Sequence, residues 1–191
     1  MHKYLKHILI YSLILIYSCT DEAKVNEETS LAPTTETPQA DENKKYNAII
    51  NGFNKAIQIL RERIKEHESR KAIVNDLDYY KNRITNYDQF ISWIEKNPDK
   101  KKELDEAWTE AYNLLEQRRA ENAPEKTLNE YINDAIDCKE NPSCQDTNKY
   151  GTQDNQINFF FGYNSHEIFS SSNNIFVSLK KIDISALKDN F

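Results

Sequence analysis

The sequence predicts an all-α protein, in which a small helical domain of about five to six helices follows a disordered N-terminal segment. The 191 residues include only three glycines and five prolines, whereas a many-stranded sandwich needs such residues at its frequent turns. From residue 46 onward, apolar residues recur at spacings of three and four, which is the period of a helix with one buried face. We therefore expect the folded domain at residues 44–191.

The first 18 residues have the features of a secretory signal peptide, expected at 1–18. A charged start is followed by an apolar run of ten residues, 8–17. A stable membrane-spanning helix takes about 20 apolar residues, so an uncleaved anchor is the less favoured alternative. Ile16, Ser18 and Cys19 then match a relaxed lipobox, in which a small residue precedes the cysteine that is acylated. Two or three acyl chains on Cys19 would attach the mature chain stably to a membrane.

Residues 19–43 are expected to form a lipidated, disordered stalk. The segment is acidic and rich in Thr, Glu and Pro, with Val25 and Leu31 as its only large aliphatic residues. Such a composition buries too little apolar surface to offset the entropy lost on ordering. A typical span of roughly 25–30 Å would lift the domain above the lipid headgroups. A ligand-binding disordered segment is the alternative.

Two apolar stripes open the domain. The first predicts a helix buried through Tyr46, Ile50, Phe53, Ile57, Leu60 and Ile64. The second runs out of phase with it, through Ile73, Leu77, Tyr80, Ile84, Tyr87, Ile91 and Ile94. One straight helix cannot bury both stripes on one face, so we expect a bend or turn at residues 67–71. Asn86 and Gln89 also form a plausible capping box, which would start a helix at Tyr87.

The later helices are predicted from their start signals and breaks. Asn97 followed by Pro98 is typical of a helix start, and the break at Ala123 and Pro124 ends that helix. Thr127 and Glu130 form a capping box that opens the next one. The buried faces are expected through Leu104, Trp108, Ala111, Tyr112 and Leu115, and then through Leu128, Tyr131, Ile132, Ala135 and Ile136. Two more short helices are expected at residues 154–163 and 172–182.

The three cysteines are an odd number, which acylation of Cys19 explains. Cys138 and Cys144 remain, with a turn at Asn141 and Pro142 between them. A disulfide between Cys138 and Cys144 can persist in an exported protein. Two free thiols are the alternative. A metal site is disfavoured because zinc normally takes four ligands and no histidine is near the pair.

The composition and motifs exclude several classes of function. The formal net charge of -6 argues against a nucleic-acid binder, which needs clustered Lys and Arg. No P-loop, GxSxG, HExxH or dinucleotide-binding fingerprint is present. His166 and Glu167 have no recognisable nucleophile or metal partner. We therefore expect no enzymatic activity, no cofactor and no metal ion.

Several segments of the chain match a known family. The matching residues include the run Asn97–Leu104, Trp108, Thr109, Tyr112 and Leu115, then Ala135–Cys138, Cys144, Tyr150, Gly151 and Phe159–Phe161. With the relaxed lipobox and the acidic stalk, they make the chain resemble the plasmid-encoded surface lipoproteins of Borrelia spirochaetes, especially the multicopy lipoprotein (Mlp) family. The resemblance covers roughly residues 85–180. It implies a lipoprotein of the outer membrane, exposed at the cell surface, which contacts host molecules.

These observations favour a surface-exposed interaction protein that binds a host protein or glycan. A periplasm-facing structural or assembly lipoprotein is the alternative. The expected contact surface lies in two polar segments far from the stalk, 139–154 and 163–174. Tyr150 and Tyr163 are the candidate binding residues, because exposed tyrosines offer a large contact area at low entropic cost. Otherwise both segments are solvated connections, and the next candidate is the charged helical face at 55–71.

Overall fold

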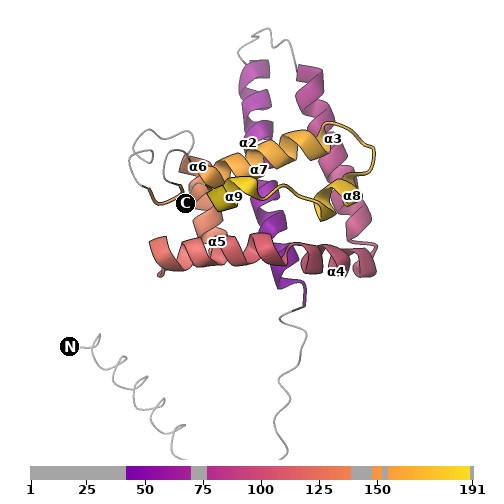
Figure 1. Ribbon diagram of the computed structural model, residues 1–191. Coiled ribbons are helices and arrows are strands. Elements are labelled where there is room, and N and C mark those ends of the chain that lie inside the picture. The colour runs from indigo at the N-terminus through magenta and orange to yellow at the C-terminus, as the bar shows by residue number, and fades with distance from the viewer. Residues whose placement is uncertain (1–41, 70–76, 139–147, 152–154, 190–191) are drawn as a thin grey trace, which may run out of the picture. The chain divides into compact units, whose positions relative to one another are not determined.

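The computed structural model describes residues 42–69, 77–138, 148–151 and 155–189. These ranges contain eight helices and no strand, which confirms the predicted all-α class (Figure 1). The helices belong to one compact unit that extends from Thr37 to Phe191. They are α2 (Lys44–Ser69), α3 (Leu77–Ile94), α4 (Pro98–Ala107), α5 (Thr109–Asn122), α6 (Leu128–Cys138), α7 (Gln156–Phe169), α8 (Ile175–Lys180) and α9 (Ser185–Asp189).

The helix α2 is the centre of the fold and packs against α3, α4, α5, α6 and α7. In Figure 1, α4 and α5 lie across its N-terminal end, whereas α7 crosses it further along. Its length of 26 residues corresponds to about 39 Å, so the two ends of α2 are far apart. The predicted stripe is buried except at Leu60, which is half-buried.

The first two helices separate where the apolar phase changes. The helix α2 ends at Ser69, as the polar run at 67–71 predicts, and α3 begins at Leu77. The boundary predicted at Asn86 is wrong, because α3 continues through it. The Asn86 side chain instead donates a hydrogen bond to the Phe169 carbonyl, at 2.9 Å. The polar side chain that could have capped a helix therefore joins α3 to α7.

Trp108 divides one predicted helix into two. Its ring is fully buried and stacked on Tyr46, with the planes 5° apart and the centroids 5.7 Å apart. The indole Nε1 donates to the Leu179 carbonyl at 2.7 Å. This contact joins residues 71 positions apart, and α4 and α5 meet at Trp108. The predicted starts at Pro98 and after Thr127 are confirmed.

The helix α7 is longer than expected, because residues 163–169 are helical and not a loop. Asn164 and Ser165 look loop-forming in the sequence but are buried. The Asn164 amide donates to the carbonyls of Phe160 and Asp183, and Ser165 accepts a hydrogen bond from Arg83. Pairing of these polar groups lets the helix continue through its buried face. The short α9 was not predicted from the sequence.

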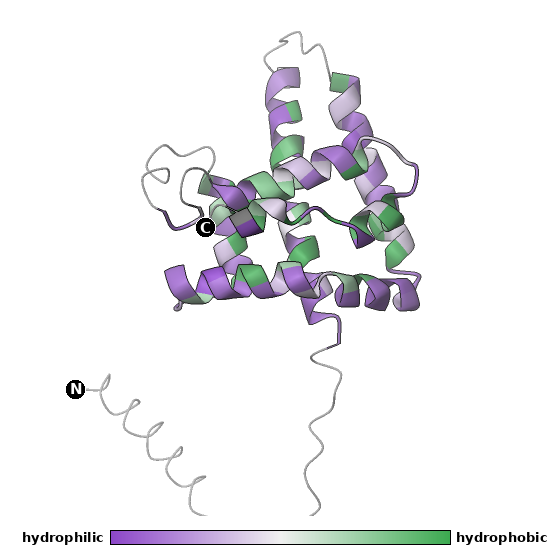
Figure 2. Cartoon of the chain, viewed as in Figure 1, coloured by the Kyte–Doolittle hydropathy of each residue, from purple (hydrophilic) through white to green (hydrophobic). Residues whose placement is uncertain are grey.

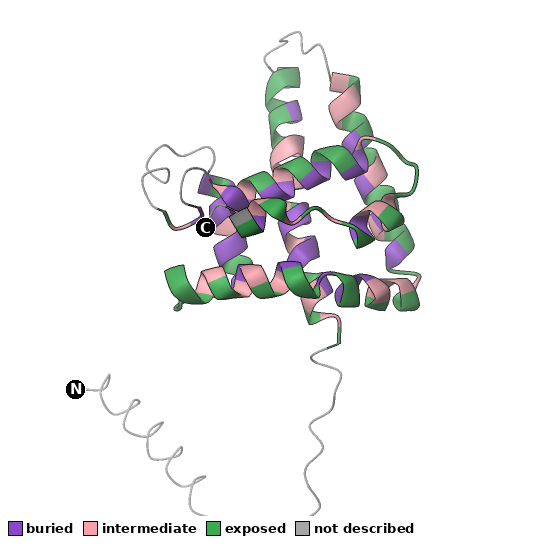
Figure 3. Ribbon diagram, viewed as in Figure 1, coloured by how far each residue is buried: buried purple, intermediate pink, exposed green. Residues whose placement is uncertain are grey.

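Each helix combines polar and apolar residues, as Figure 2 shows. Buried residues face the centre of the fold in Figure 3, and exposed residues cover the outside. Among the described residues, none of the helices has the length and hydropathy needed to cross a membrane.

Candidate functional site

Three of the predicted site residues are cysteines, one expected to be acylated and two expected to form a disulfide. Cys19, the predicted lipidation site, lies outside the described residues, with the signal peptide and nearly all of the stalk. Cys138 is the last residue of α6 and is buried. Cys144 also lies outside the described residues, so the disulfide stays a prediction.

Tyr150 does not have the exposure that the sequence predicts. Its side chain is only 6% exposed and its ring lies 5.4 Å from that of Tyr131. The Tyr131 hydroxyl donates to the Lys149 carbonyl at 2.6 Å and holds residues 148–151 against α6. Burial raises the pKa of Tyr150. The expectation of an exposed Tyr150 is therefore wrong, and this residue belongs to the core.

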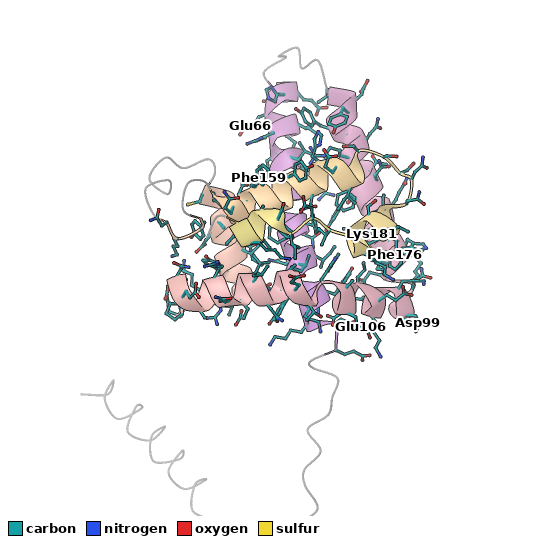
Figure 4. The ribbon with its side chains drawn as sticks, in the orientation of Figure 1. Glu66, Asp99, Glu106, Phe159, Phe176 and Lys181 are labelled. Atoms are coloured by element: carbon teal, nitrogen blue, oxygen red, sulfur yellow. The ribbon has the colours of Figure 1, made fainter. Side chains whose placement is uncertain are left out.

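Tyr163 is exposed as expected, and it has an aromatic neighbour. Tyr163 is 44% exposed and Phe159, one helical turn earlier, is 52% exposed. Their rings are stacked, with the centroids 5.5 Å apart and the planes inclined by 8°. Figure 4 labels Phe159 on α7. The two rings form an aromatic pair on the solvent side of this helix.

The pair is part of a larger surface along α7. We call Phe159, Gly162, Tyr163, His166 and Tyr79 the aromatic surface. The first four residues share one face of α7 by their spacing of three and four. The ring of Tyr79, on α3, lies 5.6 Å from that of His166. A Cβ atom at Gly162 would have no neighbour within 4 Å, so the space beside the aromatic pair is open.

Polar contacts below this surface fix its position. The Tyr79 hydroxyl and the Ser170 hydroxyl are 2.5 Å apart, which joins α3 to the end of α7. Arg83 is buried between these helices and donates to Ser165 at 2.6 Å, while its Nε has no partner in the described residues. Burial lowers the pKa of Arg83. The aromatic surface is thus held from below by two hydrogen-bonded contacts between α3 and α7.

This arrangement suits binding better than covalent chemistry. Within the described residues, no group of three or more His, Cys, Asp or Glu side chains could hold a metal ion. His166 contacts Glu167 at 2.9 Å, and both side chains are more than half exposed. Exposed aromatic rings that are already held in place are typical of protein interfaces.

The charged face at 55–71, the other predicted candidate, is partly neutralised. Lys55 lies 2.7 Å from Asp137, and Arg61 forms an ion pair with Asp88. These pairs reduce the attraction of this face for an anionic ligand.

Phe159 was missed as a site residue because it belongs to the run Phe159–Phe161, which has the composition of a core. The helical period distinguishes its members. Phe160 and Phe161 are fully buried, whereas Phe159 shares its face with Tyr163. The spacing of four between two aromatics, with Gly162 beside them, was the available signal.

Comparisons with known proteins give a consistent result. The family model described as the Mlp lipoprotein family matches residues 21–179. The chain is 30% identical to lipoprotein MlpJ of Borreliella burgdorferi over 179 residues, which covers 83% of this chain and 80% of that protein. No solved structure gives a significant match.

Proposed function

Because the chain belongs to the Mlp lipoprotein family, we propose that it is a non-enzymatic lipoprotein of the outer membrane that is exposed at the cell surface and binds a host protein. The aromatic surface on α7 is the proposed contact. The observation that carries this proposal is the stacked and exposed pair Phe159 and Tyr163 beside the open space at Gly162.

The stacked rings of Phe159 and Tyr163 still leave much apolar surface exposed to water, and a partner gains free energy by burying it. Rings that are already stacked lose little side-chain entropy on binding. Gly162 leaves room for a partner group to approach the helix closely.

A protein partner fits this surface better than a glycan. The rings of Phe159 and Tyr163 cover part of each other's faces, whereas a sugar-binding platform usually offers a free ring face for stacking. A hydrophobic side chain of a protein partner can instead fill the space at Gly162 and contact both rings. Capture of a glycan and of no protein would contradict this choice of partner.

Attachment to the membrane is tested by removing the acylated thiol. Cys19→Ala should block palmitate incorporation and release the protein from the membrane fraction, whereas Cys19→Ala would change neither property if another segment were the anchor. A Ser30→Ala variant in the stalk provides a matched control that should stay membrane-bound.

Exposure at the cell surface is tested by protease treatment of intact cells. Loss of the domain without cell lysis supports the proposal. Full protection, with digestion only after lysis, would favour the alternative of a periplasm-facing structural or assembly lipoprotein. A known periplasmic protein serves as the control for intact cells.

Binding is tested by capture from serum or extracellular matrix with residues 20–191, the mature chain without its acylated cysteine. Gly162→Gln introduces a long side chain into the open space beside Phe159 and Tyr163. It should fold normally, since no atom outside its two chain neighbours and its own helix backbone lies within 4 Å of the added Cβ, yet capture should fall by at least about tenfold. Gly162→Ala is the matched control, and it should retain more binding than Gly162→Gln. Equal capture by wild type and Gly162→Gln would refute the proposed contact.

A further inference from the structure

The outward face of α3 is a second surface, separate from the aromatic surface on α7. It lies opposite the residues that α3 buries, Arg83, Tyr87, Phe90 and Ile94. An open hollow of about 500 Å³ follows this face and is lined by Thr85, Asp88, Gln89, Ser92, Trp93 and Lys96. A volume of this size can admit a large side chain.

Trp93 stands beside the hollow and is 42% exposed. Its ring lies 5.6 Å from Phe176 of α8 and 6.1 Å from Phe90 on α3 itself. Figure 4 labels Phe176 near this part of the fold. The indole is thus held from behind while its outer part faces solvent. One helix face therefore carries both a projecting aromatic ring and a hollow next to it.

From this juxtaposition we propose that two copies of the chain associate through the outward faces of α3, in an antiparallel arrangement with two-fold symmetry. Such an interface uses the same patch on both copies, so the patch has to be complementary to itself. The face of α3 meets this requirement in shape and in charge.

The complementarity in shape follows from helical spacing. Thr85, Asp88, Gln89 and Ser92 are spaced i, i+3, i+4 and i+7, which is the set of four residues that surrounds a hole in helix packing. In an antiparallel pair whose helices cross level with residue 91, next to Ser92, Trp93 of each copy lies opposite Gln89 of this set on the other. The small Ser92 side chain at the crossing lets the helices approach to about 8 Å.

The complementarity in charge follows from the same register. Asp88 lies four residues before Ser92 on α3, or about 6 Å along the helix, and Lys96 lies four residues after Ser92 in the turn that follows the end of α3. Antiparallel pairing brings each Asp88 within reach of Lys96 on the other copy, which gives two ion pairs. Arg61 contacts only one oxygen of Asp88, and the Asp88 side chain is still 55% exposed. Among the described residues Lys96 forms no ion pair, whereas the nearby Lys101 pairs with Glu95.

The interface is short, since it involves about three turns of one helix from each copy. It is smaller than a standard stable interface, so the dimer in solution should be weak. Copies confined to one membrane have a high effective concentration, which favours the association. This proposal does not depend on the binding of a host protein.

The test is measurement of the mass of residues 20–191, the mature chain without its acylated cysteine, by sedimentation in the analytical ultracentrifuge from about 10 µM to 1 mM, a range suited to a weak dimer. The mass should rise toward that of two chains. Asp88→Lys and Lys96→Glu should each weaken the dimer by at least about tenfold, because each creates two like-charge contacts. The double variant should restore it. Glu125→Lys, at an exposed position outside α3, makes the same charge change as Asp88→Lys and should have no effect.

A second measurement locates the interface directly. Ser92→Cys should form a disulfide between copies under mild oxidation, whereas Glu125→Cys should cross-link only at the background level. Circular dichroism confirms that each variant is folded. A single-chain mass at every concentration, a dimer that the single charge changes do not weaken, or failure of the double variant to restore it would overturn the proposal. A dimer that Ser92→Cys does not cross-link would also overturn it.

Discussion

Gly52→Ala changes a close contact between α2 and α7. A Cβ atom at Gly52 would lie 2.3 Å from Cε1 and from Cζ of Phe161, and 2.7 Å from Cδ1. Ordinary carbon contacts are near 3.5–4.0 Å, so the overlap exceeds about 1 Å. The Phe161 ring is fully buried, 5.4 Å from the ring of Phe53 and 4.8 Å from that of Phe160. It cannot move away without displacing its neighbours.

The two energy terms have opposite signs. Alanine in a helix is better than glycine by about 1 kcal/mol, whereas overpacking a buried site costs about 1–3 kcal/mol or more. With an overlap of this size the steric term should be at the upper end, so we expect Gly52→Ala to lower the free energy of unfolding by about 2 kcal/mol. For a domain of this size the Tm should fall by roughly 4–8 °C.

Thermal and urea denaturation followed by circular dichroism measure this effect. Gly162→Ala is the matched control, since the new methyl group meets nothing within 4 Å and should stabilise the protein by about 0.5–1 kcal/mol. Phe161→Leu combined with Gly52→Ala should cost less than the sum of the two single changes, because the smaller side chain relieves the overlap. If Gly52→Ala stabilised the protein as much as Gly162→Ala does, the packing of α7 on α2 described above would be wrong.

Three further changes test other contacts. Thr127→Ala should lower the free energy of unfolding by about 1 kcal/mol. The backbone N–H and the hydroxyl of Thr127 both donate to the Glu130 carboxylate and hold its pKa below the ordinary value of 4.5. Thr127→Ala removes only the hydroxyl, so its effect should be full above that pH and shrink in part as the pH falls through the lowered pKa, whereas an effect that grew in acid would contradict this reasoning. Trp108→Phe should cost about 2 kcal/mol in urea denaturation, because the Leu179 carbonyl loses its buried donor and a cavity forms, whereas an unchanged midpoint would exclude that role. Arg83→Met should leave the free energy of unfolding unchanged or raise it by about 1 kcal/mol, since no carboxylate among the described residues pairs with this buried cation; a loss above about 3 kcal/mol would indicate a partner.

Local signals in the sequence were sufficient for several features of the fold. The capping box at Thr127 forms as expected: the Thr127 backbone N–H donates to the Glu130 carboxylate at 2.8 Å, and the Glu130 N–H donates to the Thr127 hydroxyl at 3.3 Å. Pro98 occupies the first turn of α4. These features depend on residues within one turn of each other, so the sequence order contains the information.

Features that depend on distant residues could not be predicted in the same way. The division at Trp108 accompanies a hydrogen bond to Leu179, and the burial of Tyr150 depends on Tyr131. The polar residues Asn164 and Ser165 are helical because partners from other elements satisfy them. Propensity alone favours a loop there, and tertiary contacts decide otherwise.

In the candidate site, the sequence identified one exposed residue correctly and failed for two others. Tyr163 was identified from its residue type and its distance along the chain from the stalk, and it is exposed. The same reasoning failed for Tyr150, because the polar residues around it gave no information on the contact with α6. Phe159 was not named as a site residue, although its phase on the helix separates it from the buried Phe160 and Phe161.

The most direct test of the central claim is the capture of host protein by intact cells that display either the wild-type lipoprotein or Phe159→Ala/Tyr163→Ala. We expect capture by wild-type cells and a reduction of at least about tenfold for the double variant, at equal surface amounts. Val177→Ser, which changes another exposed apolar side chain, should not reduce capture. Equal capture by the wild type and the double variant would contradict the claim that the aromatic surface is the contact.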